Sequence, residues 1–135
     1  GPLLDRIDIQ IEVAPVEPQE LPRMAAGKSS AEIRERVRAA RKLQAERYRD
    51  MPGVHTNADV KSRDLQRVCC LTEAMKDDLV RTIERLRLSA RAYDKVLRVA
   101  RTVADLAGSE AVRTEDVNLA LSMRRMDGEE NSFWV

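Results

Sequence analysis

At 135 residues the chain is long enough for one domain with a hydrophobic core and too short for two substantial domains. Its 24 Lys and Arg residues are balanced by 23 Asp and Glu residues, so the net charge of +1 excludes a strongly basic polyanion binder and an acidic tail. Aromatic residues make up only 3% of the chain, which is typical of packed helices and not of a β-sandwich, so we expect an all-α fold.

The first segment, LLDRIDIQIEV at residues 3–13, alternates apolar and polar side chains. The alternation from Ile7 to Val13 predicts a β-strand with one buried face. A lone strand leaves its backbone donors and acceptors unpaired along both edges, so it cannot form a sheet with a helical domain. We therefore interpret residues 1–13 as the last strand of a sheet that belongs to a larger protein.

A linker and a charged helix follow. Residues 14–28 contain three of the five prolines and no helical period, which predicts an extended connection. Ser29 and Glu32 have the spacing of a capping box, which predicts a helix that continues to about Asp50. Arginines and glutamates are interleaved along this helix, a pattern that favours intrahelical ion pairs on a solvated face.

The remaining sequence predicts four further helices. Thr72 and Thr114 are expected to cap two of them, and Gly108 is placed to end the longest. The expected segments are a short helix from Ser62 or Asp64 through Cys70, a helix capped by Thr72, a long helix after Leu88-Ser89, and a last helix capped by Thr114.

The long helix carries the clearest pattern. A broad apolar face runs from Tyr93 to Ala107, and a basic stripe of Arg91, Lys95 and Arg98 lies on the opposite side. Helices of this number and length form a compact bundle. We therefore expect a small all-α helical bundle at residues 29–126, preceded by one orphan β-strand and followed by a flexible tail at residues 127–135, which has no period.

Cysteine and histidine residues offer no site. Cys69 and Cys70 are adjacent, so we interpret them as two small buried side chains of a helix in a reducing compartment. His55 stands alone in a loop, without a second ligand at metal-binding spacing. No apolar run approaches the ~18 residues needed to span a bilayer, and we expect a cytoplasmic protein with no membrane partner.

Three segments resemble the magnesium-chelatase-like AAA+ ATPases of the bacterial ComM (YifB) group, which are implicated in DNA branch migration during natural transformation. They are GPLLDRIDIQIEV (residues 1–13), the KSSAEIRERVRAARKLQAERY helix (residues 28–48), and LRLSARAYDKVLRVARTVADLAGSEAVRTEDVNLAL (residues 86–121). The resemblance implies that the predicted strand ends the α/β ATPase core of such a protein. It also implies that the helices form the C-terminal lid domain.

The resemblance also implies two site residues. Arg6, in LLDRID, resembles the arginine finger that reaches the nucleotide of the neighbouring subunit, and Arg91, in SARAYDKVL, resembles the sensor-2 residue that faces ATP phosphate. A guanidinium group suits both roles because it is always charged and offers a planar fork of donors to phosphate oxygens.

The resemblance sets expectations for cofactors and partners as well. ATP and magnesium are expected in the full-length protein. The chain has neither a GxxxxGK[ST] loop nor a Walker-B strand, so we expect no bound cofactor and no isolated ATPase activity. The expected partners are the protein's own N-terminal AAA+ core and the neighbouring subunits of a homo-oligomeric ring, with DNA left open as a partner of that ring.

Two other function classes remain open from the sequence. One is a stand-alone nucleic-acid-binding module, in which the arginine-rich first helix and the stripe of Arg91, Lys95 and Arg98 contact phosphates. The other is a histone-fold-like dimerisation module, suggested by a long helix followed by a short connection and a final helix. An independent enzyme is the weakest class, because no paired carboxylates or Cys/His/Asp set stands out.

Overall fold

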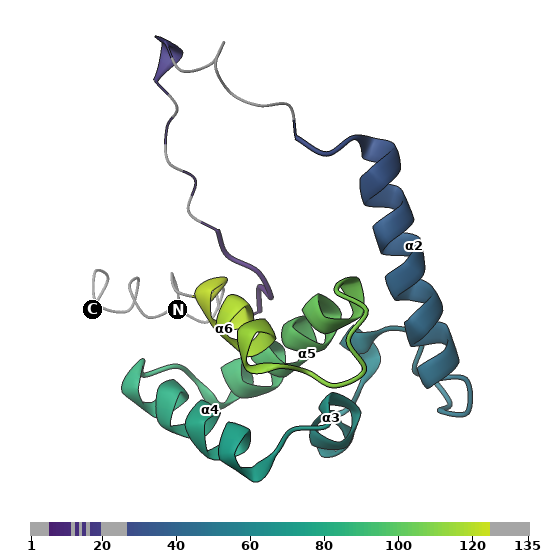
Figure 1. The fold of residues 1–135 in the computed structure, drawn as a ribbon. Helices are drawn as coiled ribbons and strands as arrows, with labels where there is room; N and C mark the ends of the chain where they lie inside the picture. Colours follow the sequence, from purple (N-terminus) through teal and green to yellow (C-terminus); the bar gives the residue numbers. More distant parts are fainter. Residues whose placement is uncertain (1–5, 12, 14, 16, 20–26, 125–135) are drawn as a thin grey trace.

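A computed structural model describes residues 6–11, 13, 15, 17–19 and 27–124 of the chain. The described residues are helical and contain no β-strand (Figure 1), which confirms the expected helical bundle. Residues 1–5 and the predicted tail at 127–135 lie outside the described part. The elements are α2 (Ser30–Arg47), the short 3₁₀ helix η2 (Asn57–Asp59), α3 (Ser62–Cys69), α4 (Glu73–Arg85), α5 (Ala90–Leu106) and α6 (Thr114–Ser122).

Helix α5 is the central element of the bundle. It packs against α2, η2, α3, α4 and α6, and the labelled helices lie around it in Figure 1. Four apolar residues on the face predicted from the sequence are fully buried, and burial of this face is the main source of the bundle's stability. These residues are Val96, Leu97, Ala100 and Ala104.

Two of the three predicted N-caps, Ser29 and Thr72, are confirmed. Their side chains each accept a hydrogen bond from the backbone N–H three residues later, and Ser89, which was not predicted as a cap, does the same at the start of α5. The third prediction, a cap by Thr114, is wrong because the N-cap residue of α6 is Arg113. There the buried carboxylate of Asp116, at the third helical position, accepts the Arg113 backbone N–H at 2.9 Å.

The predicted N-terminal strand is not formed by the described residues. Ile7, Ile9 and Ile11 are exposed and Gln10 is buried, which is the reverse of the predicted face. The physical reason is that a strand needs a neighbour, and the described residues provide none. The backbone N–H of Gln10 instead donates to the carbonyl oxygen of Met123 at 2.6 Å, so the segment lies along the helical domain.

Helix α2 is attached to the bundle at its C-terminal half only and leans away from the bundle toward its N-terminus (Figure 1). Ala40 and Gln44 are buried against the other helices. Val37 and Ile33, which lie on the same side of α2 one turn and two turns before Ala40, are exposed. The apolar side of α2 formed by Ile33, Val37 and Ala40 is therefore only partly covered within the described part of the chain.

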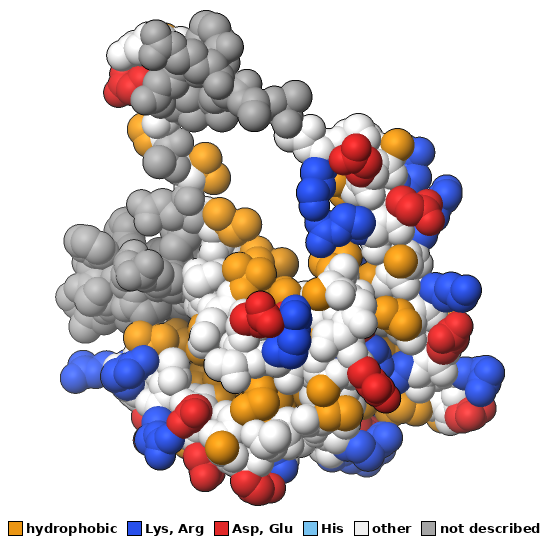
Figure 2. Space-filling view, viewed as in Figure 1, with side chains coloured by type: hydrophobic (Ala, Val, Ile, Leu, Met, Phe, Trp, Pro, Cys, Tyr) orange, Lys and Arg blue, Asp and Glu red, His pale blue; other side chains and the backbone are white. Residues whose placement is uncertain are grey.

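The intrahelical ion pairs predicted for α2 are not formed among the described residues. Its acidic residues Glu32, Glu35 and Glu46 have no basic partner within 4.0 Å, and the one ion pair made by the helix joins Arg47 to Asp105 of α5. Figure 2 shows basic and acidic side chains interspersed over α2. Holding two long side chains together on a solvated surface stabilises a helix very little, so these charges remain in solvent.

The two cysteines have different surroundings. Cys69 is buried as predicted, but Cys70 is exposed and ends α3 in the left-handed region, with φ 56°. The prediction of two buried cysteines is therefore wrong for Cys70, because the helix terminates before a second side chain can turn inward. Among the described residues, no helix is long and apolar enough to cross a membrane.

Candidate functional site

Arg91 lies in the first turn of α5, next to the helix N-terminus. Ser89 caps this helix, its hydroxyl accepting the Ala92 backbone N–H at 3.3 Å. The Arg91 side chain is exposed and makes no hydrogen bond or ion pair in the part of the chain that the structure describes. Its guanidinium group is therefore available to a ligand from outside this domain.

Arg6 lies beside the same helix, although 85 positions separate it from Arg91 in the sequence. The link is Lys95, one turn after Arg91 on α5. Its ammonium group donates to the backbone carbonyl oxygen of Arg6 at 3.4 Å and to the Asp8 carboxylate at 2.5 Å. The Arg6 side chain is exposed, and within the described part it has no partner. The structure thus brings the Arg6 segment to the helix that carries Arg91.

The chemistry of this region is that of an anion-binding surface. The exposed Arg91 side chain lies in the first turn of α5, where the backbone dipole favours negative charge, and Lys95, one turn further along, holds the backbone of Arg6. A phosphate group matches the planar fork of a guanidinium group. The described residues contain no group of three or more His, Cys, Asp or Glu side chains that could hold a metal ion.

The basic stripe predicted on α5 is largely used within the domain. Arg98 donates two hydrogen bonds to the Val60 carbonyl oxygen, at 3.1 and 2.9 Å, and thereby attaches α5 to the loop before α3. Lys95 is bound to the N-terminal segment. Only Arg91 of the stripe remains without a partner among the described residues, so α5 does not present three free cations to a nucleic acid.

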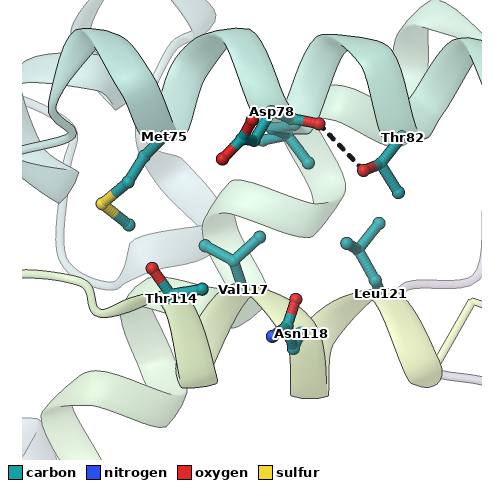
Figure 3. Close-up of a pocket in the computed structure, with 8 residues that line it drawn as sticks. Met75, Asp78, Thr82, Thr114, Val117, Asn118 and Leu121 are labelled. Atoms are coloured by element: carbon teal, nitrogen blue, oxygen red, sulfur yellow. Dashed lines mark hydrogen bonds between the residues drawn. The ribbon is translucent and has the colours of Figure 1, made fainter.

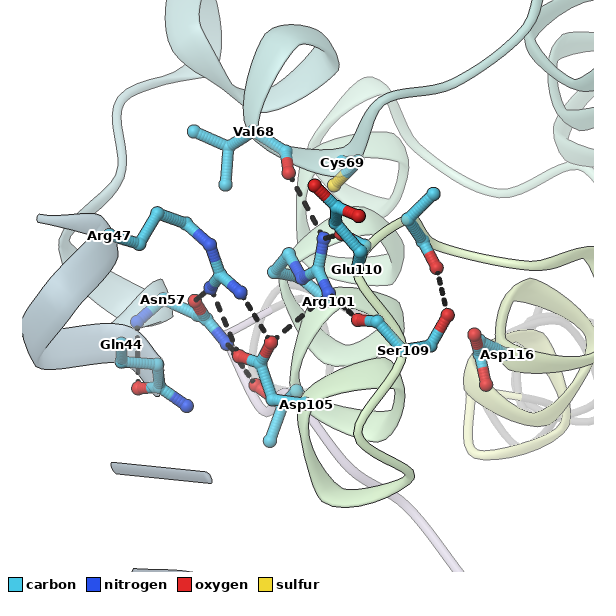
Figure 4. A network of polar contacts seen from close by, with 12 residues as sticks. Gln44, Arg47, Asn57, Val68, Cys69, Arg101, Asp105, Ser109, Glu110 and Asp116 are labelled. Carbon is cyan, nitrogen blue, oxygen red and sulfur yellow. Dashed lines mark hydrogen bonds and ion pairs between the residues drawn. The ribbon is translucent and has the colours of Figure 1, made fainter. Parts of the chain in front are cut away.

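A buried ionic network, which the sequence did not indicate, lies at the junction of α2, η2 and α5 (Figure 4). Asp105 of α5 is 2% exposed and receives both terminal nitrogens of Arg47, at 2.6 and 3.1 Å. It also accepts a hydrogen bond from the amide of Asn57 at 3.0 Å and forms an ion pair with Arg101 at 3.1 Å. The hydroxyl of Tyr48 donates to Oδ1 of Asn57, the oxygen of the same side-chain amide.

These partners decide the charge of the network. Burial alone would raise the pKa of Asp105, but the hydrogen bonds from Arg47 and Asn57 and the positive charge of Arg101 hold it below its ordinary value. Burial likewise opposes the charged form of Arg47, yet Asp105 raises the pKa of that guanidinium. Asp105 and Arg47 are therefore both ionised at neutral pH, and the network stabilises the attachment of α2.

Arg101 has a structural role, since its side chain is 1% exposed. Its guanidinium donates to three backbone carbonyl oxygens, those of Val68, Ser109 and Glu110, at 2.7 to 3.1 Å. It thereby joins the end of α3 to the connection between α5 and α6. A signal was present in the sequence, because Arg101 and Asp105 stand four residues apart beside the apolar face of α5.

Two further features are separate from this site. A pocket between α4 and α6 is lined by apolar residues that include Met75 and Leu121 and by the polar residues Asp78 and Asn118 (Figure 3), and neither Arg6 nor Arg91 lines it. Burial raises the pKa of the Cys69 thiol to about 12, so it is not a nucleophile at neutral pH. His55 is exposed in its loop.

Comparison with known proteins places these observations in a family. The family described as "Magnesium chelatase, subunit ChlI C-terminal" matches residues 27–124. The chain is 37% identical to "Competence protein ComM" of Haemophilus influenzae over 93% of its length, and 34% identical to "Uncharacterized protein YifB" of Salmonella typhimurium over 94%. It spans 24% of the length of each of these relatives. The chain belongs to the magnesium chelatase ChlI C-terminal domain family, within proteins similar to ComM and YifB.

Proposed function

We propose that this chain is the helical lid of a magnesium-chelatase-like AAA+ ATPase and that it supplies two arginines to ATP hydrolysis. Arg6 acts as an arginine finger on the nucleotide of the neighbouring subunit, and Arg91 acts as the sensor-2 residue toward ATP phosphate. Such groups accelerate phosphoryl transfer because they stabilise the charge that develops on the transferred phosphate.

One observation supports this proposal above the others. The Arg6 segment is bound to α5 through Lys95, one turn from Arg91, and both arginine side chains are exposed and without a partner among the residues that the structure describes. The buried arginines of the same domain are satisfied by carboxylate and carbonyl oxygens, so a role inside the domain accounts for them. No such role within the described residues accounts for Arg6 or Arg91.

The remaining parts of the machinery lie in the full-length protein under this proposal. ATP and magnesium bind to its AAA+ core, and this chain alone binds neither. The partners are that core and the adjacent subunits of a homo-oligomeric ring, and the work of the ring is related to DNA. The relation to DNA rests on the resemblance to the ComM group, and the relative from Haemophilus influenzae is named a competence protein.

The test is steady-state ATP turnover by the full-length protein. We expect Arg6→Ala and Arg91→Ala each to lower kcat by about a hundredfold or more, the size of effect seen when an arginine contact to the transferred phosphate is lost. Arg36→Ala is the matched control, because Arg36 is an exposed arginine in the N-terminal half of α2, the part of that helix that leans away from the bundle. It should hydrolyse ATP at the normal rate.

Trans action by Arg6 has its own test. Arg6→Ala subunits mixed with subunits that cannot bind ATP should regain activity, since the second subunit supplies the finger and the first supplies the nucleotide site. Normal turnover by both single variants would show that these arginines have no role in hydrolysis.

A further inference from the structure

The N-terminal segment at residues 6–10 is held in place by hydrogen bonds from the helical domain. Residues 6–10 have no helix or strand structure of their own. Their backbone and side-chain oxygens accept hydrogen bonds from Lys95 on α5 and Arg124 after α6, and the Gln10 N–H donates to Met123. The position of this segment is therefore set by residues far away in the sequence.

Arg124 provides the buried part of this attachment. It is completely buried, and its Nη1 atom donates to the carbonyl oxygens of Ile7 at 2.5 Å and Asp8 at 3.4 Å. A buried guanidinium group is costly unless oxygen atoms accept its hydrogen bonds, so these carbonyls and Arg124 stabilise one another. Arg124 also lies just beyond the C-terminus of α6, where the helix dipole favours a positive charge.

Lys95 provides the part nearest to Arg6 and Arg91. Its side chain is mostly covered, and its ammonium group donates to the Arg6 carbonyl oxygen and the Asp8 carboxylate. Because Lys95 stands one turn from Arg91 on a rigid helix, the backbone of Arg6 is held at a fixed place relative to Arg91.

We propose that Lys95 and Arg124 are positioning residues for Arg6. They attach the backbone that carries Arg6 to α5 and to the end of α6, so that Arg6 moves together with the helical domain that carries Arg91. This inference rests on the proposed function, because it gives Arg6 a catalytic contact in need of positioning. A displacement of about 1 Å at such a contact lowers the rate by up to ~100-fold.

The test uses the full-length protein and the variant Lys95→Met, which keeps much of the side-chain length and removes the donors. We expect kcat to fall about tenfold while the KM for ATP stays within about twofold, because a misplaced finger weakens the transition state and not nucleotide binding. Hydrogen–deuterium exchange of the peptide covering residues 6–11 should become faster. Lys95→Arg, which keeps donors and charge, should restore most of kcat and of the protection.

Arg124→Met is the second variant, and Lys42→Met, an exposed lysine of α2, is the matched control with normal kcat and exchange. If Arg124→Met fails to fold, Lys95→Met decides the question, since Lys95 is not fully buried. A normal kcat in Lys95→Met together with a lowered kcat in Arg6→Ala would overturn the positioning role and leave the proposed function intact. A fall in kcat without faster exchange would also overturn it. A normal rate in Arg6→Ala would instead show that the proposed function itself is wrong.

Discussion

The buried and the exposed arginines of this domain have the same side chain and opposite surroundings. Arg101 and Arg124 are no more than 1% exposed, and carbonyl and carboxylate oxygens accept their hydrogen bonds. Arg6 and Arg91 are exposed and keep their donors unused within the described residues. The comparison teaches that the first pair holds segments of the fold together, whereas the second pair is available to a ligand.

The cost of a charge differs between the two environments for a physical reason. In the interior an unpaired ion is strongly unfavourable, so each buried arginine is retained together with its acceptors. At the surface water solvates the charge, and a free guanidinium group costs the fold little. Three changes test this distinction, from the largest expected effect on stability to the smallest.

Asp105→Asn is expected to have the largest effect. It removes the carboxylate that faces Arg47 and Arg101, and breaking a buried ion pair from one side lowers the free energy of unfolding by about 3–5 kcal/mol. Urea denaturation of the chain measures this loss. Asp78→Asn is the control, because Asp78 pairs with Arg81 on the exposed side of α4 and should cost less than about 1 kcal/mol. If Asp105→Asn lowered the free energy of unfolding no more than Asp78→Asn, the network would not stabilise the attachment of α2.

The pH dependence of stability follows from the same carboxylate. The pKa of Asp105 is lower in the folded chain than in the unfolded one, so its charge stabilises the fold fully above the ordinary value of about 3.9. This stability is lost as the pH falls through the folded value. The difference in unfolding free energy between the natural chain and Asp105→Asn should therefore be largest near pH 7 and shrink below about pH 4. A difference independent of pH would show that Asp105 acts through packing alone.

Arg6→Ala and Arg91→Ala are expected to have the smallest effect on stability. Both side chains are exposed and without partners in the described part, so each change should alter the free energy of unfolding by no more than about 0.5 kcal/mol. Urea denaturation and the helical circular dichroism signal check this in the same chain. A loss of several kcal/mol in the free energy of unfolding would show that Arg6 and Arg91 hold the fold together, as Arg101 and Arg124 do.

Helices and most of their starts were predictable because their signals are local. Ser29 and Thr72 cap helices as predicted, since a hydroxyl group and a backbone N–H three residues later suffice for a cap. The cap predicted at Thr114 is wrong because Thr114 is already the first residue of α6, and the Asp116 carboxylate at the third helical position holds the backbone N–H of the N-cap residue Arg113. The N-terminal alternation was read correctly as a pattern, but a strand forms only beside another strand.

The amino-acid sequence by itself determined the helical class, the broad apolar face of α5, and, through family resemblance, the choice of Arg6 and Arg91 as candidates. These follow from local periodicity and short motifs, which act over a few residues. Only the tertiary structure decided which arginines are buried, that Arg47 and Arg101 share Asp105, and that Lys95 and Arg124 hold the segment of Arg6. The reason is that burial and ion pairing depend on distances between residues far apart in the chain, and these are set only when the helices pack.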